Sequence, residues 1–195
     1  NKFSAADEPK RVLARLGFRV DKLQTDAEER PGKHASPVCF GIQIPNDVRL
    51  LFRPVKPCTD LESSFHEHGH GMHFIAISEH APYWDRYTIP NGVAELFSTL
   101  LERLMKKQVF LTSQFKVSKE TAEDASERTR FMELYFLTFY AANSLMKIEF
   151  WEEGLSMEQA NERYERYTQE FMGLRLPGKY WQLHHVMPDY DLYSP

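Results

Sequence analysis

The segment His66-Glu67-His68-Gly69-His70 contains two histidines four residues apart, with a glutamate directly after the first. On an α-helix, residues four apart lie on the same face, so His66 and His70 can present two imidazoles to one metal ion. Glu67 lies about 100° around the helix from His66, and its carboxylate can reach a water bound to that metal. Two neutral imidazoles beside a carboxylate base are the groups that zinc-dependent peptide hydrolysis uses.

The sequence predicts that this pattern lies inside a helix. Thr59 and Glu62 have the spacing of a capping box, with Thr59 as the N-cap. Apolar residues then recur at helical spacing from Leu61 to Ile75. We therefore expect a helix at about residues 60–77, which would hold the two histidines on one face.

A catalytic zinc site uses three protein ligands and leaves one position to water. Glu95 is the best candidate for the third ligand, because it lies in a second predicted helix, at about 91–108, with Pro90 near its start. Glu102 follows Glu95 by two turns on the same face. Its carboxylate can accept the second ring N–H of a ligating histidine, which makes it a candidate supporting residue.

The remaining histidines are less suited to the metal. His73 shares the face of the two candidate ligands, so a site of three histidines stays open as an alternative. His68 points off that face, and we expect it to meet solvent or to line the cleft. His34 and His80 are interpreted as ordinary residues without a metal role.

The run HEHGHGMH resembles the metal-binding helix of the thimet oligopeptidase and oligoendopeptidase F family of zinc peptidases, which reads His-Glu-x-Gly-His-x-x-His. The run VAELFSTLLE resembles the second-ligand helix of that family, especially its oligoendopeptidase F version. The resemblance implies that one Zn²⁺ is held by His66, His70 and Glu95. It also implies that Glu67 is the general base and Glu102 a supporting carboxylate.

Two more segments resemble this family. Residues 30–35 are similar to its Arg-x-Gly-Lys segment, which leads into the sheet beside the cleft, and residues 185–193 are similar to its C-terminal loop of a histidine and tyrosines. That loop supplies donors to the substrate and to the tetrahedral intermediate, which implies this role for His185 and Tyr190. His184 is the alternative to His185, but only His185 places Tyr190 at the spacing of the family.

The predicted fold class is mainly α with a small antiparallel β-hairpin before the metal helix. Residues 38–44 and 48–52 read as two strands around a turn at 45–47, and further helices are expected at about 119–152 and 157–172. The resemblance implies a zincin-like metallopeptidase catalytic domain. An edge strand of the hairpin would then bind the backbone of a peptide as an added strand.

The chain has 195 residues, which is enough for one domain with its own core. We interpret residues 1–195 as a single catalytic domain. Members of the resembled family are much longer and carry an N-terminal helical half, so we expect this chain to be an excerpt of a longer peptidase that lacks that half. Apolar surface made for the missing half would then be available for self-association.

The charge and composition of the chain indicate which classes of binding partner to expect. The net charge is −4 and no basic stripe is present, which argues against nucleic acid. No apolar stretch approaches transmembrane length, so we expect no membrane partner. Cys39 and Cys58 form no disulfide framework and are interpreted as buried free thiols, in keeping with a cytoplasmic location. The expected partners are oligopeptide substrates.

These inferences favour a metalloendopeptidase that hydrolyses oligopeptides through a metal-bound water, with Glu67 as general base. Two alternatives stay open. One is a non-catalytic module that binds zinc and peptide. The other is a carboxypeptidase or dipeptidyl carboxypeptidase of the same motif class, which a basic residue that captures the terminal carboxylate of the substrate would mark. Arg53, Lys33 and Arg130 are candidates for that residue, and the sequence does not distinguish among them.

Overall fold

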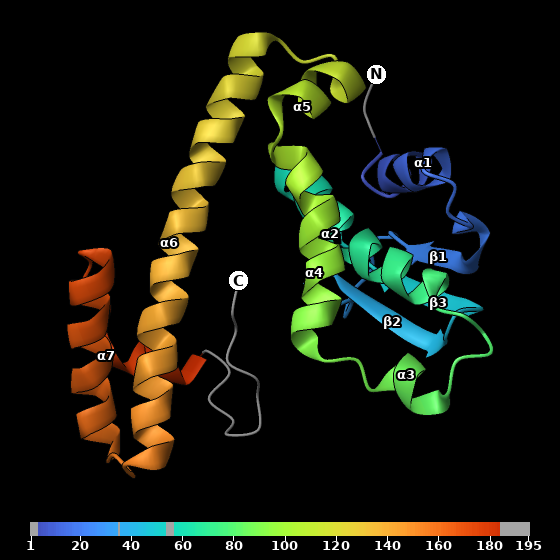
Figure 1. Cartoon of the computed structure of the whole chain (residues 1–195). Coiled ribbons are helices and arrows are strands. Elements are labelled where there is room, and N and C mark those ends of the chain that lie inside the picture. The colour runs from blue at the N-terminus through green and yellow to red at the C-terminus, as the bar shows by residue number, and fades with distance from the viewer. Residues whose placement is uncertain (1–3, 35, 54–56, 184–195) are drawn as a thin grey trace. The chain divides into compact units, whose positions relative to one another are not determined.

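The computed structural model describes residues 4–34, 36–53 and 57–183 (Figure 1). The chain divides into two compact units, Asn1–Ala125 and Ser126–Pro195, and each unit contains a cluster of buried apolar residues. The assignment of both units to one catalytic domain over residues 1–195 stays a prediction.

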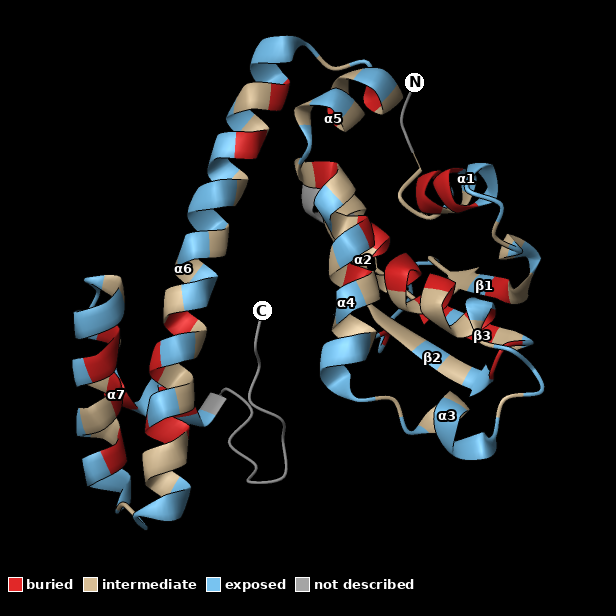
Figure 2. Ribbon diagram, viewed as in Figure 1, coloured by how far each residue is buried: buried red, intermediate tan, exposed pale blue. Residues whose placement is uncertain are grey.

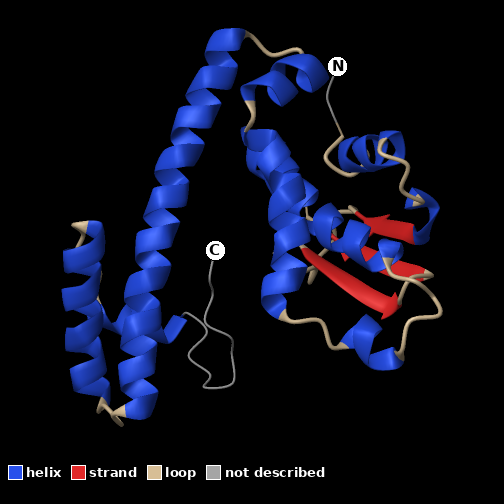
Figure 3. Ribbon diagram, in the orientation of Figure 1, coloured by secondary structure: helices blue, strands red, loops and turns tan. Residues whose placement is uncertain are grey.

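The first unit combines helices with a small sheet. Its helices are α1 (Glu8–Arg15), α2 (Pro57–Ala76), α3 (Tyr83–Tyr87), α4 (Asn91–Glu102) and α5 (Gln108–Phe115), with 3₁₀ turns at Val20–Lys22 and Arg103–Lys106, and its strands are β1 (Leu23–Asp26), β2 (Val38–Gln43) and β3 (Asp47–Leu51). Figure 3 shows that helices predominate in the described chain and that these strands form one sheet. The mainly helical class with a small sheet before α2 is therefore confirmed.

The sheet has the strand order β1-β3-β2. The predicted hairpin is present, because β2 pairs antiparallel with β3. The prediction of a purely antiparallel sheet is wrong, because β1 pairs parallel with β3, with Leu23 opposite Val48. In β1 only Leu23 is buried. A strand this short, with one buried side chain, lacks the alternation that would have predicted it.

One face of the sheet packs against α2. Val48 and Leu50 of β3 are buried, whereas Arg49 between them is exposed, as the two-residue period of a strand requires. They share a core cluster with Phe65 and Met72 of α2, and Figure 2 shows buried positions on α1, α2 and the sheet. This packing fixes the rotation of α2, and therefore the direction in which its other faces point.

The observed helices differ from the predicted ones mainly at their ends. Thr59 is not an N-cap, because α2 begins at Pro57 and Thr59 lies in its first turn. The helix predicted at 91–108 is shorter: α4 ends at Glu102 and a 3₁₀ turn follows over Arg103–Lys106. The two helices predicted further on are confirmed as α6 (Lys119–Glu152) and α7 (Met157–Met172).

The second unit is a pair of helices closed by a short turn. It holds most of α6, all of α7 and a 3₁₀ turn at Gly178–Leu183. A capping box at Ser156 begins α7, and Gly173, with φ of 68°, ends it. The indole N–H of Trp181 donates to Asn161 Oδ1 at 2.8 Å, which holds the last turn against α7. Among the described residues, no helix has both the length and the apolar character needed to cross a membrane.

Candidate metal centre

His66 and His70 lie one turn apart on α2, and their rings approach each other edge to face with centroids 5.0 Å apart. Their side chains are 27% and 15% exposed, so both rings are partly covered and still reach the surface. This placement follows from the helical period alone, because residues four apart on a helix share a face.

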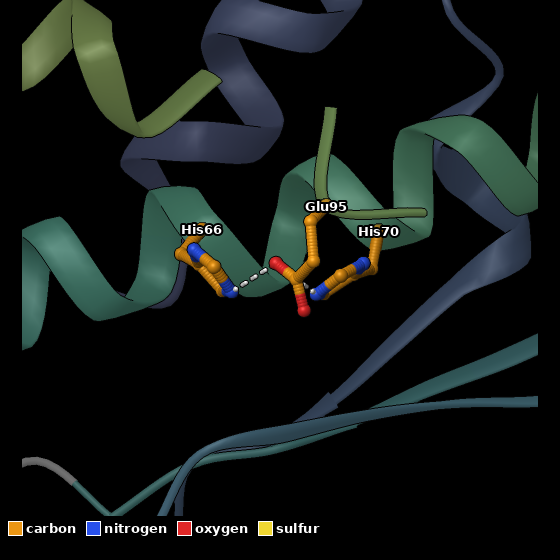
Figure 4. A group of neighbouring side chains, drawn as sticks. All are labelled: His66, His70 and Glu95. Atoms are coloured by element: carbon orange, nitrogen blue, oxygen red, sulfur yellow. Dashed lines mark ion pairs between the residues drawn. The ribbon is translucent and has the colours of Figure 1, made fainter. Parts of the chain in front are cut away.

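Glu95 brings the third donor atom from α4. Its Oε2 lies 3.4 Å from His66 Nε2 and 3.7 Å from His70 Nε2, and Figure 4 shows the carboxylate between the two imidazoles. One donor atom from each residue lies within 4.8 Å of the others. Ligands about 2.0–2.1 Å from a tetrahedral zinc are separated by about 3.3 Å. The donor set therefore fits Zn²⁺, and both distances from Glu95 Oε2 are close to this separation.

A close helix crossing carries Glu95 to this position. A Cβ atom added at Gly69 would lie 2.5 Å from both the Phe97 carbonyl oxygen and Ser98 Cα. Such a distance is shorter than any normal contact, so α2 and α4 touch through their backbones at Gly69. Beside this point the ring of His73 stacks on Phe97 with centroids 4.2 Å apart.

Both imidazoles also make a hydrogen bond to another group of the protein. His66 Nδ1 lies 2.9 Å from Glu102 Oε2, and a ring N–H of His70 donates to the backbone carbonyl of Ala94. When His66 is neutral, Glu102 keeps its proton on Nδ1 and leaves the Nε2 lone pair toward Glu95. This is the tautomer that a metal ligand requires.

Glu102 is kept ionised for this role. Burial acts to raise the pKa of Glu102, but hydrogen bonds from His66 and Lys106 outweigh burial and bring this pKa below its usual value. Lys106 Nζ lies 2.8 Å from Glu102 Oε1. The carboxylate therefore accepts from the imidazole on one oxygen and pairs with an ammonium on the other.

Glu67 has the properties of a proton-transfer group. Burial raises the pKa of its carboxyl group to about 7, with the charge of His66 opposing this shift and that of Glu95 adding to it. The backbone N–H of Cys39 donates a hydrogen bond to the same carboxylate. Glu67 is thus tied to β2, and a pKa near neutrality suits a group that must accept and release a proton.

The structure corrects the expectation for His68, which is 1% exposed and does not meet solvent or a cleft. Its Nδ1 lies 2.7 Å from the carbonyl oxygen of Ser64 in the previous turn. His68 lies on a face of α2 away from the candidate ligands. The charges of Lys10 in α1 and of Asp7 at its N-cap act on the imidazole, so His68 lies close to α1. The helical period excluded it from the metal face but could not show that α1 covers it.

Burial of His68 predicts acid sensitivity of the fold. Burial lowers the pKa of this imidazole to about 4, against about 6.5 in an unfolded chain. Between these values the unfolded chain binds more protons, so stability falls as the pH drops from about 6.5 to about 4, by about 3 kcal/mol in total. Urea unfolding of the metal-free chain at several pH values from 4 to 7 measures this dependence. The free energy of unfolding should change less with pH in His68→Gln than in the wild type.

His80→Gln is the matched control, because the side chain of His80 is 89% exposed. This variant should keep the wild-type dependence of stability on pH. Equal slopes in His68→Gln and the wild type would show that protonation of His68 does not oppose folding.

Of the other residues predicted to act at the site, some lie among the described residues and some outside them. Among the described residues, the candidate metal group contains His66, His70 and Glu95 and does not include His73. The positions of His185 and Tyr190, like that of the alternative His184, lie outside the described residues. Their roles therefore stay predictions, as does the assignment of Cys58 as a buried thiol.

Sequence reasoning missed Ser98, whose Oγ lies 2.7 Å from Glu95 Oε2. Ser98 lies three residues beyond Glu95 on α4, so the helical period could have indicated this pair. The sequence leaves the pairing of Glu102 with Lys106 as an alternative to a supporting role, and the structure shows Glu102 in contact with both Lys106 and His66. The hydrogen bond from Cys39 to Glu67 joins a strand to a helix, and no local pattern predicts it.

The sequence matches the model of a protein family described as Peptidase family M3, over residues 13–194. This range includes the segments that resemble the thimet oligopeptidase and oligoendopeptidase F family, and the match confirms that resemblance. No curated protein sequence matches the chain.

Proposed function

Because the chain belongs to peptidase family M3, a family of zinc metallopeptidases, we propose that it is a metalloendopeptidase that hydrolyses oligopeptides. The observation that carries this proposal is the convergence of His66, His70 and Glu95 on one point. Glu67, one residue along α2 from His66, supplies the carboxylate that peptide hydrolysis needs.

Each group of residues at the site has its own role in hydrolysis. Zn²⁺ held by the two imidazoles and Glu95 would supply a Lewis acid that activates water and polarises the peptide carbonyl. Glu67 takes one proton from the attacking water, and then gives a proton to the nitrogen of the breaking C–N bond. We further propose that His185 and Tyr190 donate hydrogen bonds to the oxygen that gains charge.

Strand β2 is suited to bind the substrate. It lies at the edge of the sheet, and its Cys39 N–H reaches Glu67. An extended peptide added to this edge would run beside the general base, and main-chain hydrogen bonds would fix its register. Such binding depends little on side chains, which supports oligopeptides of varied sequence as substrates.

Metal removal should abolish cleavage. We expect the chain to cleave a quenched fluorescent oligopeptide, and we expect a strong chelator to reduce the rate by at least about 100-fold, since both the ligand set and the activated water depend on the metal. Stoichiometric Zn²⁺ should restore the rate. Metal binding without chelator-sensitive cleavage would instead favour a non-catalytic module that binds zinc and peptide.

The exopeptidase alternative needs a cation that is available to a substrate carboxylate. The side chain of Lys33 is buried, and its Nζ lies 2.9 Å from Asp26 Oδ1. Arg53 lies 2.6 Å from Glu29 Oε1. Lys33 and Arg53 are thus already paired within the protein, which argues against these two of the three candidates. Arg130 is exposed on α6, so the exopeptidase alternative stays open. Cleavage of an amidated peptide at the same rate as its free-acid form is the corresponding test.

A further inference from the structure

Ser98 lies three residues after Glu95 on α4, and its side chain is fully buried. Its Oγ lies 2.7 Å from Glu95 Oε2 and 3.0 Å from the backbone carbonyl oxygen of Glu95. The hydroxyl has one proton, which it donates to one acceptor at a time, and the carboxylate oxygen is the nearer. This Oε2 is also the oxygen that faces the Nε2 atoms of His66 and His70.

Packing covers the Glu95 side chain only in part. Its side chain is 28% exposed, and a glutamate on a helix surface has several staggered rotamers available. Ser98, in contrast, is fixed by the helix crossing, since a Cβ at Gly69 would lie 2.5 Å from its Cα. The backbone of α2 therefore fixes the place from which the Ser98 hydroxyl reaches the carboxylate.

The hydrogen bond is compatible with a ligand role for the same carboxylate. A carboxylate oxygen has two lone pairs, so Oε2 can accept from Ser98 and still face the two imidazoles. Carboxylates that bind metals are in turn hydrogen-bonded, and loss of such a partner typically costs 10–100-fold in metal affinity.

We propose that Ser98 is a positioning residue that holds the Glu95 carboxylate in its metal-binding orientation. This inference rests on the proposed function, because it takes Glu95 to be a ligand. Ser98 contacts neither the metal nor the substrate in this account, and it acts only through Glu95.

The test compares Zn²⁺ affinities of the full chain, measured by competition with a chromophoric chelator. Ser98→Ala removes the hydroxyl and keeps a strong helix former in α4. We expect it to bind Zn²⁺ about 10–100-fold more weakly than the wild type. Thr99→Val is the matched control, because it removes a hydroxyl from the neighbouring position at nearly constant shape. It should stay within about 2-fold of the wild type, since its hydroxyl has no assigned part in the site.

Co²⁺ in place of Zn²⁺ supplies a second readout that a purely structural role would not change. The visible absorption of bound Co²⁺ reports the geometry of its ligands, so Ser98→Ala should alter this spectrum and Thr99→Val should not. Wild-type affinity in Ser98→Ala overturns the inference. Weaker binding with an unchanged Co²⁺ spectrum and lower thermal stability also overturns it, because a general loss of folding would explain that result.

The outcome also separates this inference from the proposed function. If the wild type binds Zn²⁺ and cleaves peptides while Ser98→Ala is indistinguishable from it, the inference fails and the proposed function stands. If the wild-type chain binds no Zn²⁺, both fail together.

Discussion

Glu67→Gln should retain Zn²⁺ and lose nearly all turnover. The amide has the shape of the carboxylate, and its oxygen can still accept from the Cys39 N–H that contacts Glu67. It cannot take a proton from water, and general base catalysis contributes about 10²–10⁴-fold. We therefore expect kcat and kcat/KM to fall together by at least about 100-fold, with metal content unchanged by elemental analysis.

Glu79→Gln is the matched control, because Glu79 follows α2 and its side chain is 59% exposed. This variant should have wild-type turnover. Near-normal turnover in metal-loaded Glu67→Gln would remove Glu67 from the mechanism. Loss of metal together with activity would instead assign Glu67 to the integrity of the site.

Gly69→Ala should disrupt the metal centre although it adds only a methyl group. The new Cβ would lie 2.5 Å from the backbone of α4 at Phe97 and Ser98. Backbone cannot rotate away as a side chain can, so α4 must shift by about 1 Å to reach ordinary contact distances. A misplacement of this size costs about 10²-fold in rate, and overpacking costs about 1–3 kcal/mol of stability. Competition with a chelator measures the Zn²⁺ affinity, peptide cleavage measures the rate, and urea unfolding measures the stability.

Gly71→Ala provides the control on the same helix. Its Cβ would meet the Leu23 side chain at 2.8 Å, and Leu23 can adjust by rotation. Because Gly71 faces β1 and not α4, this variant should lose some stability but keep its Zn²⁺ affinity. Equal Zn²⁺ affinity in both variants would show that the crossing at Gly69 does not determine the position of Glu95.

The sequence predicted the metal-binding face of α2 because one helical period relates His66, Glu67 and His70. Glu95 is the candidate third ligand because it lies in a second predicted helix, and the resemblance implies the same residue. No local pattern states which helix will pack against α2. The structure supplies the missing step through the contact between Gly69 and α4.

Several features of the fold depend on contacts between distant segments. Strand β1 pairs with β3, although β2 lies between them in the sequence. The residues of β1 show too little alternation of buried and exposed side chains to predict the strand. The burial of His68 depends on α1 covering that face of α2, which the period of α2 cannot reveal. The link from Cys39 to Glu67 likewise exists only after the sheet and α2 have packed together.

The donor atoms of the candidate site come from two helices, α2 and α4, joined by a segment in which α3 contacts the turn between β2 and β3. Tyr87 Oη accepts from the Ile44 N–H at 3.0 Å, and Arg86 Nη1 donates to the Ile44 carbonyl at 3.1 Å. A divalent ion bound by His66, His70 and Glu95 would act as a removable cross-link between the two helices. Global unfolding must then release the ion, so each tenfold rise in free metal above its dissociation constant adds about 1.4 kcal/mol to the free energy of unfolding.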